Sequence, residues 1–259
     1  MLPVPAIDFR RTPVTLLLAA VAAALELVCT FEPERREVYY MTWKLGLLST
    51  IWSGELWRPF TTALLHGSVI HAAFNIYWLM TFGRALEPFF GSFRYLLVIV
   101  LLAFVSMVPS FLVSNWDAPL DGQQAIVGLS GVVYGLFGIL WVGRRYRRDF
   151  DAVCGQDVVQ MLVAWFFICI VLTYLKIMLV ANVAHGLGCA VGVLYGLAML
   201  APARRWAWRA LAVLVTLVLL FPSIAAPGHP LYAKYVKNER IRTLIQQMPA
   251  EADQLREDG

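Results

Sequence analysis

Charged side chains are scarce in this sequence. Only 15% of its 259 residues are Asp, Glu, Lys or Arg, whereas 60% are hydrophobic. A soluble domain has about a quarter charged and about half apolar residues, so we predict an integral membrane protein built mainly as one helical bundle. The net charge is +4, and basic residues gather at the ends of apolar segments, as in membrane-protein loops. We therefore expect no nucleic-acid surface.

Cysteine is also rare, and its spacing fits neither a metal site nor a disulfide framework. The chain has four cysteines: Cys29, Cys154, Cys169 and Cys189. We expect them to be small buried side chains, and we expect neither a metal nor a cofactor. A cleavable signal peptide is not evident, because the first apolar run extends to Phe31 and is too long for one.

Long apolar segments divide the chain and predict an all-α polytopic membrane protein. Residues 1–12 are expected to form a cytoplasmic N-terminal segment, residues 13–200 a six-span core, residues 206–224 a seventh transmembrane helix, and residues 225–259 a polar tail. The six core spans are expected at residues 13–31, 66–86, 93–113, 129–143, 158–180 and 182–200.

The segment 32–65 does not form a clean span. It begins with a run of charged residues and continues with many aromatic ones, a composition typical of the headgroup layer. We predict a structured outer loop that lies partly in the membrane. Glu26, within the first span, is expected to reach toward the interface rather than stay in the apolar layer.

Arginines indicate the topology. If the spans alternate from Pro13, most of the arginines fall on one side, which places the N-terminus in the cytoplasm. The second, fourth and sixth spans then all begin near the outer face. Because a spanning helix needs about 20 residues, the short fourth span would leave Ser130 below that face, in a protein-lined wet cavity.

The starts of these three spans carry residues that suit nucleophilic catalysis. A serine hydroxyl is a weak nucleophile unless a base takes its proton, and His185 is the candidate base for Ser130. Gly128 and Gly131 allow a tight turn whose free N–H groups could bind an oxyanion. Tyr134, one turn beyond the serine, would support the imidazole.

Two further patterns support this interpretation. His71 and Asn75 are four residues apart, so they project from one helix face and could complete an oxyanion hole with their side chains. Glycines repeat along the fourth and sixth spans, a pattern that allows close helix approach: Gly135, Gly138, Gly188, Gly192 and Gly196. Each feature taken alone is compatible with a different role, since an intramembrane histidine can mark a proton path and Asn75 can bond between helices.

Together these residues resemble the rhomboid intramembrane serine proteases. The resemblance runs from Trp57 to Gly196 and rests on the order and spacing of Trp57-Arg58, His66, His71, Asn75, Glu87, Gly91, Gly128-Leu129-Ser130-Gly131, Tyr134, His185, Gly188 and Gly192. It implies a six-helix core and a Ser–His dyad without a catalytic aspartate.

The resemblance also implies roles for individual residues. Ser130 would be the nucleophile, His185 the general base, and His71, Asn75 and the Ser130 backbone the oxyanion hole. Trp57 and Arg58 would belong to the membrane-embedded outer loop. His66 and Glu87 would be structural hydrogen-bonding positions, and Tyr134, Gly128 and Gly131 would support the catalytic residues.

We therefore expect an intramembrane serine endopeptidase that cleaves transmembrane or membrane-anchored proteins near the outer face of a bacterial cytoplasmic membrane. Its partners would be these substrates and the lipid bilayer. Three alternatives remain open: a transporter or proton-linked carrier that uses the polar residues as a path, a non-catalytic protein that binds membrane helices, and a rhomboid-type processing protease dedicated to one sorting tail. A carrier more often shows internal repeats, and the sequence has none of fixed period.

Overall fold

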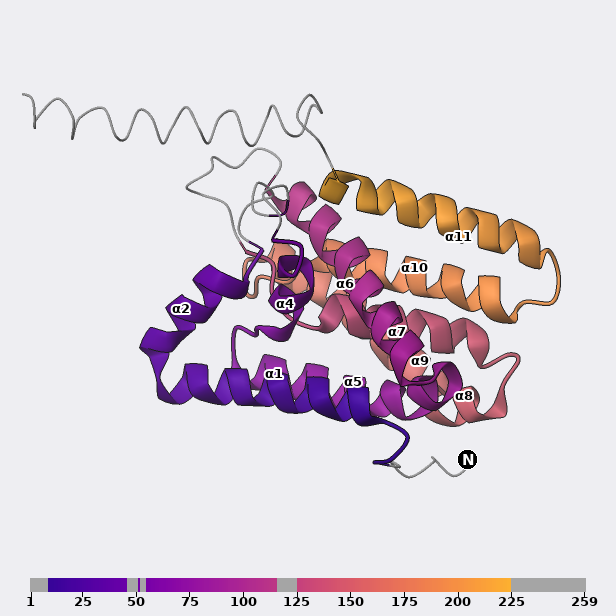
Figure 1. The fold of residues 1–259 in the computed structure, drawn as a ribbon, viewed down its shortest axis with the longest axis horizontal. Coiled ribbons are helices and arrows are strands. Elements are labelled where there is room, and N and C mark those ends of the chain that lie inside the picture. Colours follow the sequence, from indigo (N-terminus) through magenta and orange to yellow (C-terminus); the bar gives the residue numbers. More distant parts are fainter. Residues whose placement is uncertain (1–8, 46–50, 52–54, 116–124, 225–259) are drawn as a thin grey trace, which may run out of the picture.

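The computed structural model describes residues 9–45, 51, 55–115 and 125–224 (Figure 1). Their helices are α1 (Pro13–Phe31), α2 (Pro33–Trp43), α4 (Arg58–Leu64), α5 (Val69–Phe90), α6 (Ser92–Ser114), α7 (Ser130–Gly143), α8 (Arg148–Val153), α9 (Gln156–Tyr174), α10 (Asn182–Leu200), α11 (Arg205–Leu220) and the 3-10 helix η2 (Phe221–Ile224). Within these ranges the only β-type pairing is one isolated antiparallel bridge between Leu45 and Ile126. The predicted all-α architecture is therefore confirmed.

Apolar helices make this an integral membrane protein. Four described helices are long and apolar enough to cross a membrane, namely α1, α6, α9 and α10, and α7 is a shorter apolar helix. The 22-residue α5 carries the polar side chains expected of the second span. A helix occupies the position of the predicted seventh span, as α11, but its crossing of the membrane stays a prediction. The tail 225–259 and residues 1–8 lie outside the described residues.

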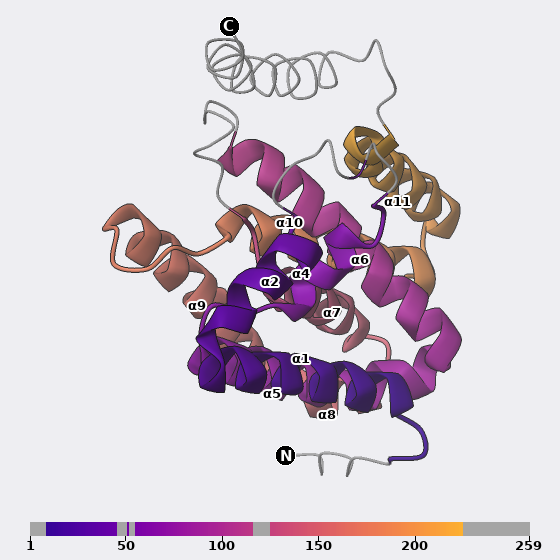
Figure 2. The same cartoon turned by 60° about the vertical axis from the view of Figure 1, so that its left-hand side comes forward.

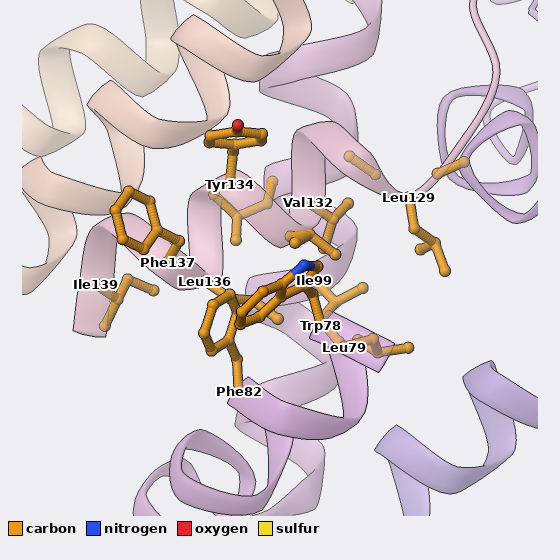
Figure 3. Close-up of a cluster of buried hydrophobic side chains, with 14 of the residues drawn as sticks. Trp78, Leu79, Phe82, Ile99, Leu129, Val132, Tyr134, Leu136, Phe137 and Ile139 are labelled. Carbon is orange, nitrogen blue, oxygen red and sulfur yellow. The ribbon is translucent and has the colours of Figure 1, made fainter. Parts of the chain in front are cut away.

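Helix α7 lies in the middle of the bundle (Figure 2), where it contacts α5, α6 and α10. All residues from Gly131 to Leu140 are buried. Aromatic and branched side chains from α5, α6 and α7 form the surrounding core (Figure 3), in which Phe82 stacks on Phe137 with ring centroids 6.3 Å apart. The short helix is therefore enclosed by protein along most of its length.

Glycines let α7 and α10 approach backbone to backbone. A Cβ atom added at Gly188 would lie 2.0 Å from the carbonyl oxygen of Gly131, and one added at Gly192 would lie 2.0 Å from that of Gly135. Contacts this short do not occur between real atoms, so both positions require glycine. The small-residue pattern on these two helices thus corresponds to their contact surface.

Glu87 lies near the C-terminal end of α5, where it joins this helix to α1 and α6. Its carboxylate, fully buried, accepts hydrogen bonds from the backbone N–H groups of Val14 (2.9 Å) and Thr15 (2.8 Å), from the Thr15 hydroxyl (2.7 Å) and from the Ser92 hydroxyl (2.7 Å). The first N–H groups of a helix have no intrahelical partner, so this carboxylate caps α1 and also complements its dipole.

Several boundaries differ from the sequence-based expectation. Helix α5 continues through Pro88 to Phe90, because a proline in the last turn removes only one hydrogen bond, and the turn comes at Gly91 with φ 75°. Helix α9 ends at Tyr174, short of the expected residue 180. The outer-loop segment contains the helices α2 and α4, although residues 46–50 and 52–54 lie outside the described part.

The expectation for Glu26 was wrong. Its side chain is only 4% exposed, and its carboxylate forms an ion pair with Arg36 on α2, with 3.1 Å between Nη2 and Oε1. The physical reason is that α2 folds back beside the end of α1 and brings the charged partner to the carboxylate, so Glu26 has no need to reach the interface.

Candidate active site

The backbone that leads into Ser130 is held by α4 and by the turn after it. The Thr62 hydroxyl donates to the carbonyl of Ile126 (2.6 Å), and the N–H of Gly128 donates to the carbonyl of Thr62 (3.3 Å). The N–H of Leu129 donates to Nε2 of His66 (3.4 Å). Three hydrogen bonds from α4 and the turn after it thus hold the backbone between Ile126 and Leu129.

Gly128 shapes this segment. Its φ of 108° is a conformation that residues with a Cβ rarely adopt. A Cβ there would also lie 2.7 Å from Cε1 and 2.9 Å from Nε2 of His71, and 3.7 Å from Nδ2 of Asn75. Both α5 side chains therefore point at the backbone two residues before Ser130. Asn75 uses one N–H to donate to the His71 carbonyl (3.1 Å), which leaves its other N–H for a ligand.

Ser130 is the first residue of α7 and is partly exposed, whereas Gly131 and the residues after it are buried. At a helix start the N–H groups have no carbonyl partner four residues earlier. Gly131 packs tightly, since a Cβ on it would lie 2.7 Å from the Ser106 hydroxyl oxygen and 3.3 Å from the Cβ of Ala184. Gly131, directly after Ser130, thus lies against the start of α10.

His185, on the first turn of α10, stacks on Tyr134 of α7. The two ring centroids are 4.6 Å apart and the ring planes differ by 23°. Tyr134 is in turn fixed by its hydroxyl, which donates to the carbonyl of Leu162 on α9 (3.0 Å). The Nδ1 atom of His185 is buried and has no hydrogen-bond partner among the described residues. Stacking on Tyr134 therefore orients this imidazole.

His66 lies beneath the site as a hydrogen-bonding bridge. Its Nδ1 is 3.1 Å from the carbonyl of Leu64, and its Nε2 accepts from the N–H of Leu129. Because a carbonyl can only accept, Nδ1 carries the proton, and the ring is neutral with a lone pair on Nε2. Its edge faces the ring of His71, with centroids 5.0 Å apart.

The structure groups the predicted residues in two sets: His71 and Asn75 lie against Gly128, two residues before Ser130, and His185 stacks on Tyr134, one turn after it. His66 bonds to Leu129, and Gly131 packs against Ser106 and α10. Glu87 is not among them and serves the other end of α5. Arg58 holds the outer loop through an ion pair with Glu55 and a hydrogen bond from Nη1 to the carbonyl of Lys44 (2.8 Å). Trp57 beside it is 53% exposed.

Sequence reasoning missed three residues that hold this site from outside. Thr62 bonds to the loop before the serine, and Arg36 and Tyr40 of α2 donate to the carbonyl of His66. A signal for Arg36 existed, since an acidic residue in an apolar span favours a basic partner nearby. Among the described residues, no group of three or more His, Cys, Asp and Glu side chains is placed to hold a metal ion.

Comparison with known proteins identifies the family of this chain. The sequence model of a family described as Rhomboid domain matches residues 53–202. The chain is 29% identical over 198 residues to the rhomboid protease GlpG of Enterobacter sp., covering 76% of this chain and 66% of the relative. It is 37% identical over 142 residues to that of Pectobacterium atrosepticum, covering 54% and 47%. The matches span less than two thirds of the length of these relatives.

Proposed function

The chain belongs to the rhomboid family, and from this premise we propose that it is an intramembrane serine protease with a Ser130–His185 dyad. The observation that carries the proposal is the stacking of His185 on Tyr134, one turn beyond Ser130. This stacking supports a base near the start of α7, where Ser130 is partly exposed and the first N–H groups of a helix lack intrahelical partners. The two relatives reported above are both named as rhomboid proteases.

The reaction would follow the general scheme of serine acyl transfer. His185 takes the proton from the Ser130 hydroxyl as its oxygen attacks the carbonyl carbon of the scissile peptide bond. The imidazolium then gives this proton to the nitrogen of the leaving peptide, and an acyl-enzyme remains on Ser130. A water molecule, deprotonated by His185, hydrolyses the ester and restores the serine.

The oxyanion that forms during attack would be bound by the N–H of Ser130 and by the side chains of His71 and Asn75. Both side chains already point at the backbone of Gly128, and the packing of His71 against His66 restricts its ring. Such preorganised donors act mainly on the transition state, and loss of one typically costs about 2.7–4 kcal/mol.

The substrate would be a transmembrane or membrane-anchored protein that is cut near the outer face. Helix α9 is the least buried of the four long apolar helices, and its Trp165 meets Phe74 of α5 with ring centroids 5.6 Å apart. We infer that a substrate helix enters between α5 and α9, which would separate these two rings. The arginine distribution favours a cytoplasmic N-terminus in a bacterial inner membrane.

Replacing the proposed nucleophile tests the function. Ser130→Ala and His185→Ala should each abolish cleavage of a membrane-anchored reporter in proteoliposomes, and Ser130→Ala should also abolish covalent labelling by a fluorophosphonate. Ser106→Ala is the matched control, because this buried hydroxyl donates to the carbonyl of Leu102 in its own helix (2.6 Å) and should retain both activities. Cleavage by Ser130→Ala would refute the dyad.

The same proteoliposomes separate the other functions that the sequence left open. Solute or proton flux without proteolysis would identify a carrier. Binding of membrane helices that is unchanged in Ser130→Ala, with no cleavage by the parent protein, would identify a non-catalytic binder.

A further inference from the structure

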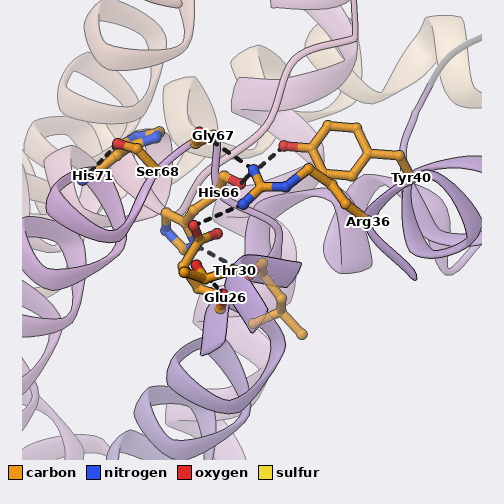
Figure 4. A network of polar contacts seen from close by, with 9 residues as sticks. Glu26, Thr30, Arg36, Tyr40, His66, Gly67, Ser68 and His71 are labelled. Atoms are coloured by element: carbon orange, nitrogen blue, oxygen red, sulfur yellow. Dashed lines mark hydrogen bonds and ion pairs between the residues drawn. The ribbon is translucent and has the colours of Figure 1, made fainter. Parts of the chain in front are cut away.

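A partly buried ion pair between α1 and α2 lies next to the candidate site but outside the residues that the proposed chemistry uses (Figure 4). Glu26 is the acidic member, 4% exposed near the end of the apolar α1, and its Oε1 lies 3.1 Å from Nη2 of Arg36. Separating two charges from water is costly, and a buried pair therefore needs good geometry and further hydrogen bonds. The other contacts of Arg36 show where these bonds go.

Arg36 holds the turn between α4 and α5. Its Nη1 donates to the carbonyls of His66 (3.4 Å) and Gly67 (3.3 Å), while its Nη2 faces Glu26. Tyr40, one turn further along α2, donates its hydroxyl to the same His66 carbonyl (2.9 Å). The planar fork of a guanidinium suits this double task, whereas a single ammonium does not.

The turn held in this way leads to the reacting groups by two routes. The first is the His66 imidazole, which accepts from the N–H of Leu129, the residue before Ser130. The second is Ser68, directly after Gly67, whose hydroxyl caps α5 by accepting from the N–H of His71 (3.3 Å). A displacement of residues 66–67 would therefore move both the serine backbone and His71.

We propose that Glu26 and Arg36 are positioning residues of the proteolytic reaction. Glu26 fixes the guanidinium of Arg36, and Arg36 with Tyr40 fixes the turn at residues 66–67, so that the oxyanion-binding groups are in place before substrate binds. None of these side chains touches the reacting atoms. This inference rests on the proposed function and assigns to the outer-loop helix α2 a part in the transition state.

A positioning role predicts a loss in kcat rather than in KM. Arg36→Gln should lower kcat about 10- to 100-fold, since displacements near 1 Å at reacting groups cost up to about 100-fold, and KM for a membrane-anchored substrate should stay unchanged. Rates are normalised to active sites titrated to the end point with a fluorophosphonate, which removes any contribution from unfolded protein. The matched control is Arg35→Gln, because the neighbouring Arg35 is exposed and pairs only with Glu32 among the described residues.

Two milder variants decide the matter if Arg36→Gln does not fold. Tyr40→Phe removes one donor to the His66 carbonyl and should lower kcat severalfold without changing KM. Arg36→Lys keeps the charge beside Glu26 but cannot serve both carbonyls, so it should unfold near the parent temperature and still lose about tenfold in kcat.

Parent-level kcat in Tyr40→Phe and Arg36→Lys would overturn the inference, as would an equal loss in Arg35→Gln. Ser130→Ala is measured in parallel to separate the two proposals. Cleavage by Ser130→Ala means that the dyad is wrong, whereas an inert Ser130→Ala beside unaffected Arg36 variants means that only the positioning role is wrong.

Discussion

Adding one methyl group to the α7–α10 contact should separate the two halves of the proposed dyad. In Gly188→Ala the new Cβ would lie 2.0 Å from the carbonyl oxygen of Gly131. That atom belongs to the backbone directly after Ser130 and cannot rotate away. Since His185 lies on the first turn of the same α10 helix, the substitution should displace the imidazole from the serine without altering either side chain.

The size of the effect follows from the geometry. Carbon and carbonyl oxygen settle at about 3.3–3.6 Å, so the two backbones must move apart by more than about 1 Å. Displacement of reacting groups by about 1 Å costs roughly 100-fold in rate, which corresponds to about 2.7 kcal/mol of activation free energy. Overpacking of a tight contact costs a further 1–3 kcal/mol or so in folding free energy.

The assay compares two glycines on the same helix. Gly186→Ala is the matched control, because its Cβ would lie 3.7 Å from the nearest atom, on the Phe166 ring, which is an ordinary contact. Both variants gain the same helix propensity. We expect kcat per titrated active site to fall about 100-fold in Gly188→Ala and to stay within about twofold in Gly186→Ala. Equal activity and equal thermal midpoints in the two variants would refute the close packing on which the dyad depends.

Two further substitutions test the supports of the bundle and the base. Glu87→Gln should lower the free energy of unfolding by about 1–3 kcal/mol, because the neutral amide replaces a buried acceptor of the Thr15 N–H and hydroxyl. Thermal unfolding in detergent measures this loss. The kcat per active site should stay unchanged. Tyr134→Phe keeps the ring on His185 but loses the bond to Leu162, so it should retain most of the activity that Tyr134→Ala loses. Equal activity in the two Tyr134 variants would contradict an orienting role for the stacking.

Much of the helical frame could be predicted from apolar run length. The bounds of α10 agree with the expected residues 182–200, and α1 with residues 13–31, because both helices border polar or proline-containing segments. The α5 boundary was less accurate, since Pro88 has a weak effect in a last turn. The helices α2 and α4 were not predicted within the outer loop, because their short amphipathic sequences gain stability mainly from tertiary contacts.

Two local features of the candidate site could be predicted from the sequence: the shared helix face of His71 and Asn75, which both lie against Gly128, and the support of His185 by Tyr134. What the sequence did not reveal is how they are held. The bond from Leu129 to His66 joins residues 63 positions apart, and the Arg36 contact with the Gly67 carbonyl joins a side chain to a backbone atom. Neither has a residue pattern of its own, so both depend on the three-dimensional packing.

Because α7 is enclosed by other helices and α9 is not, substitutions in these two helices are limited by different surroundings. The residues from Gly131 to Leu140 are buried against protein, so acceptable replacements there are decided by the shapes of their neighbours. Helix α9 is mostly unburied, so apart from its contacts with α5 and α7 its replacements should depend more on the thickness and fluidity of the host membrane. Moving such a protein between organisms with different lipids should therefore require changes in α9, while the segment that carries the serine can be transferred unaltered.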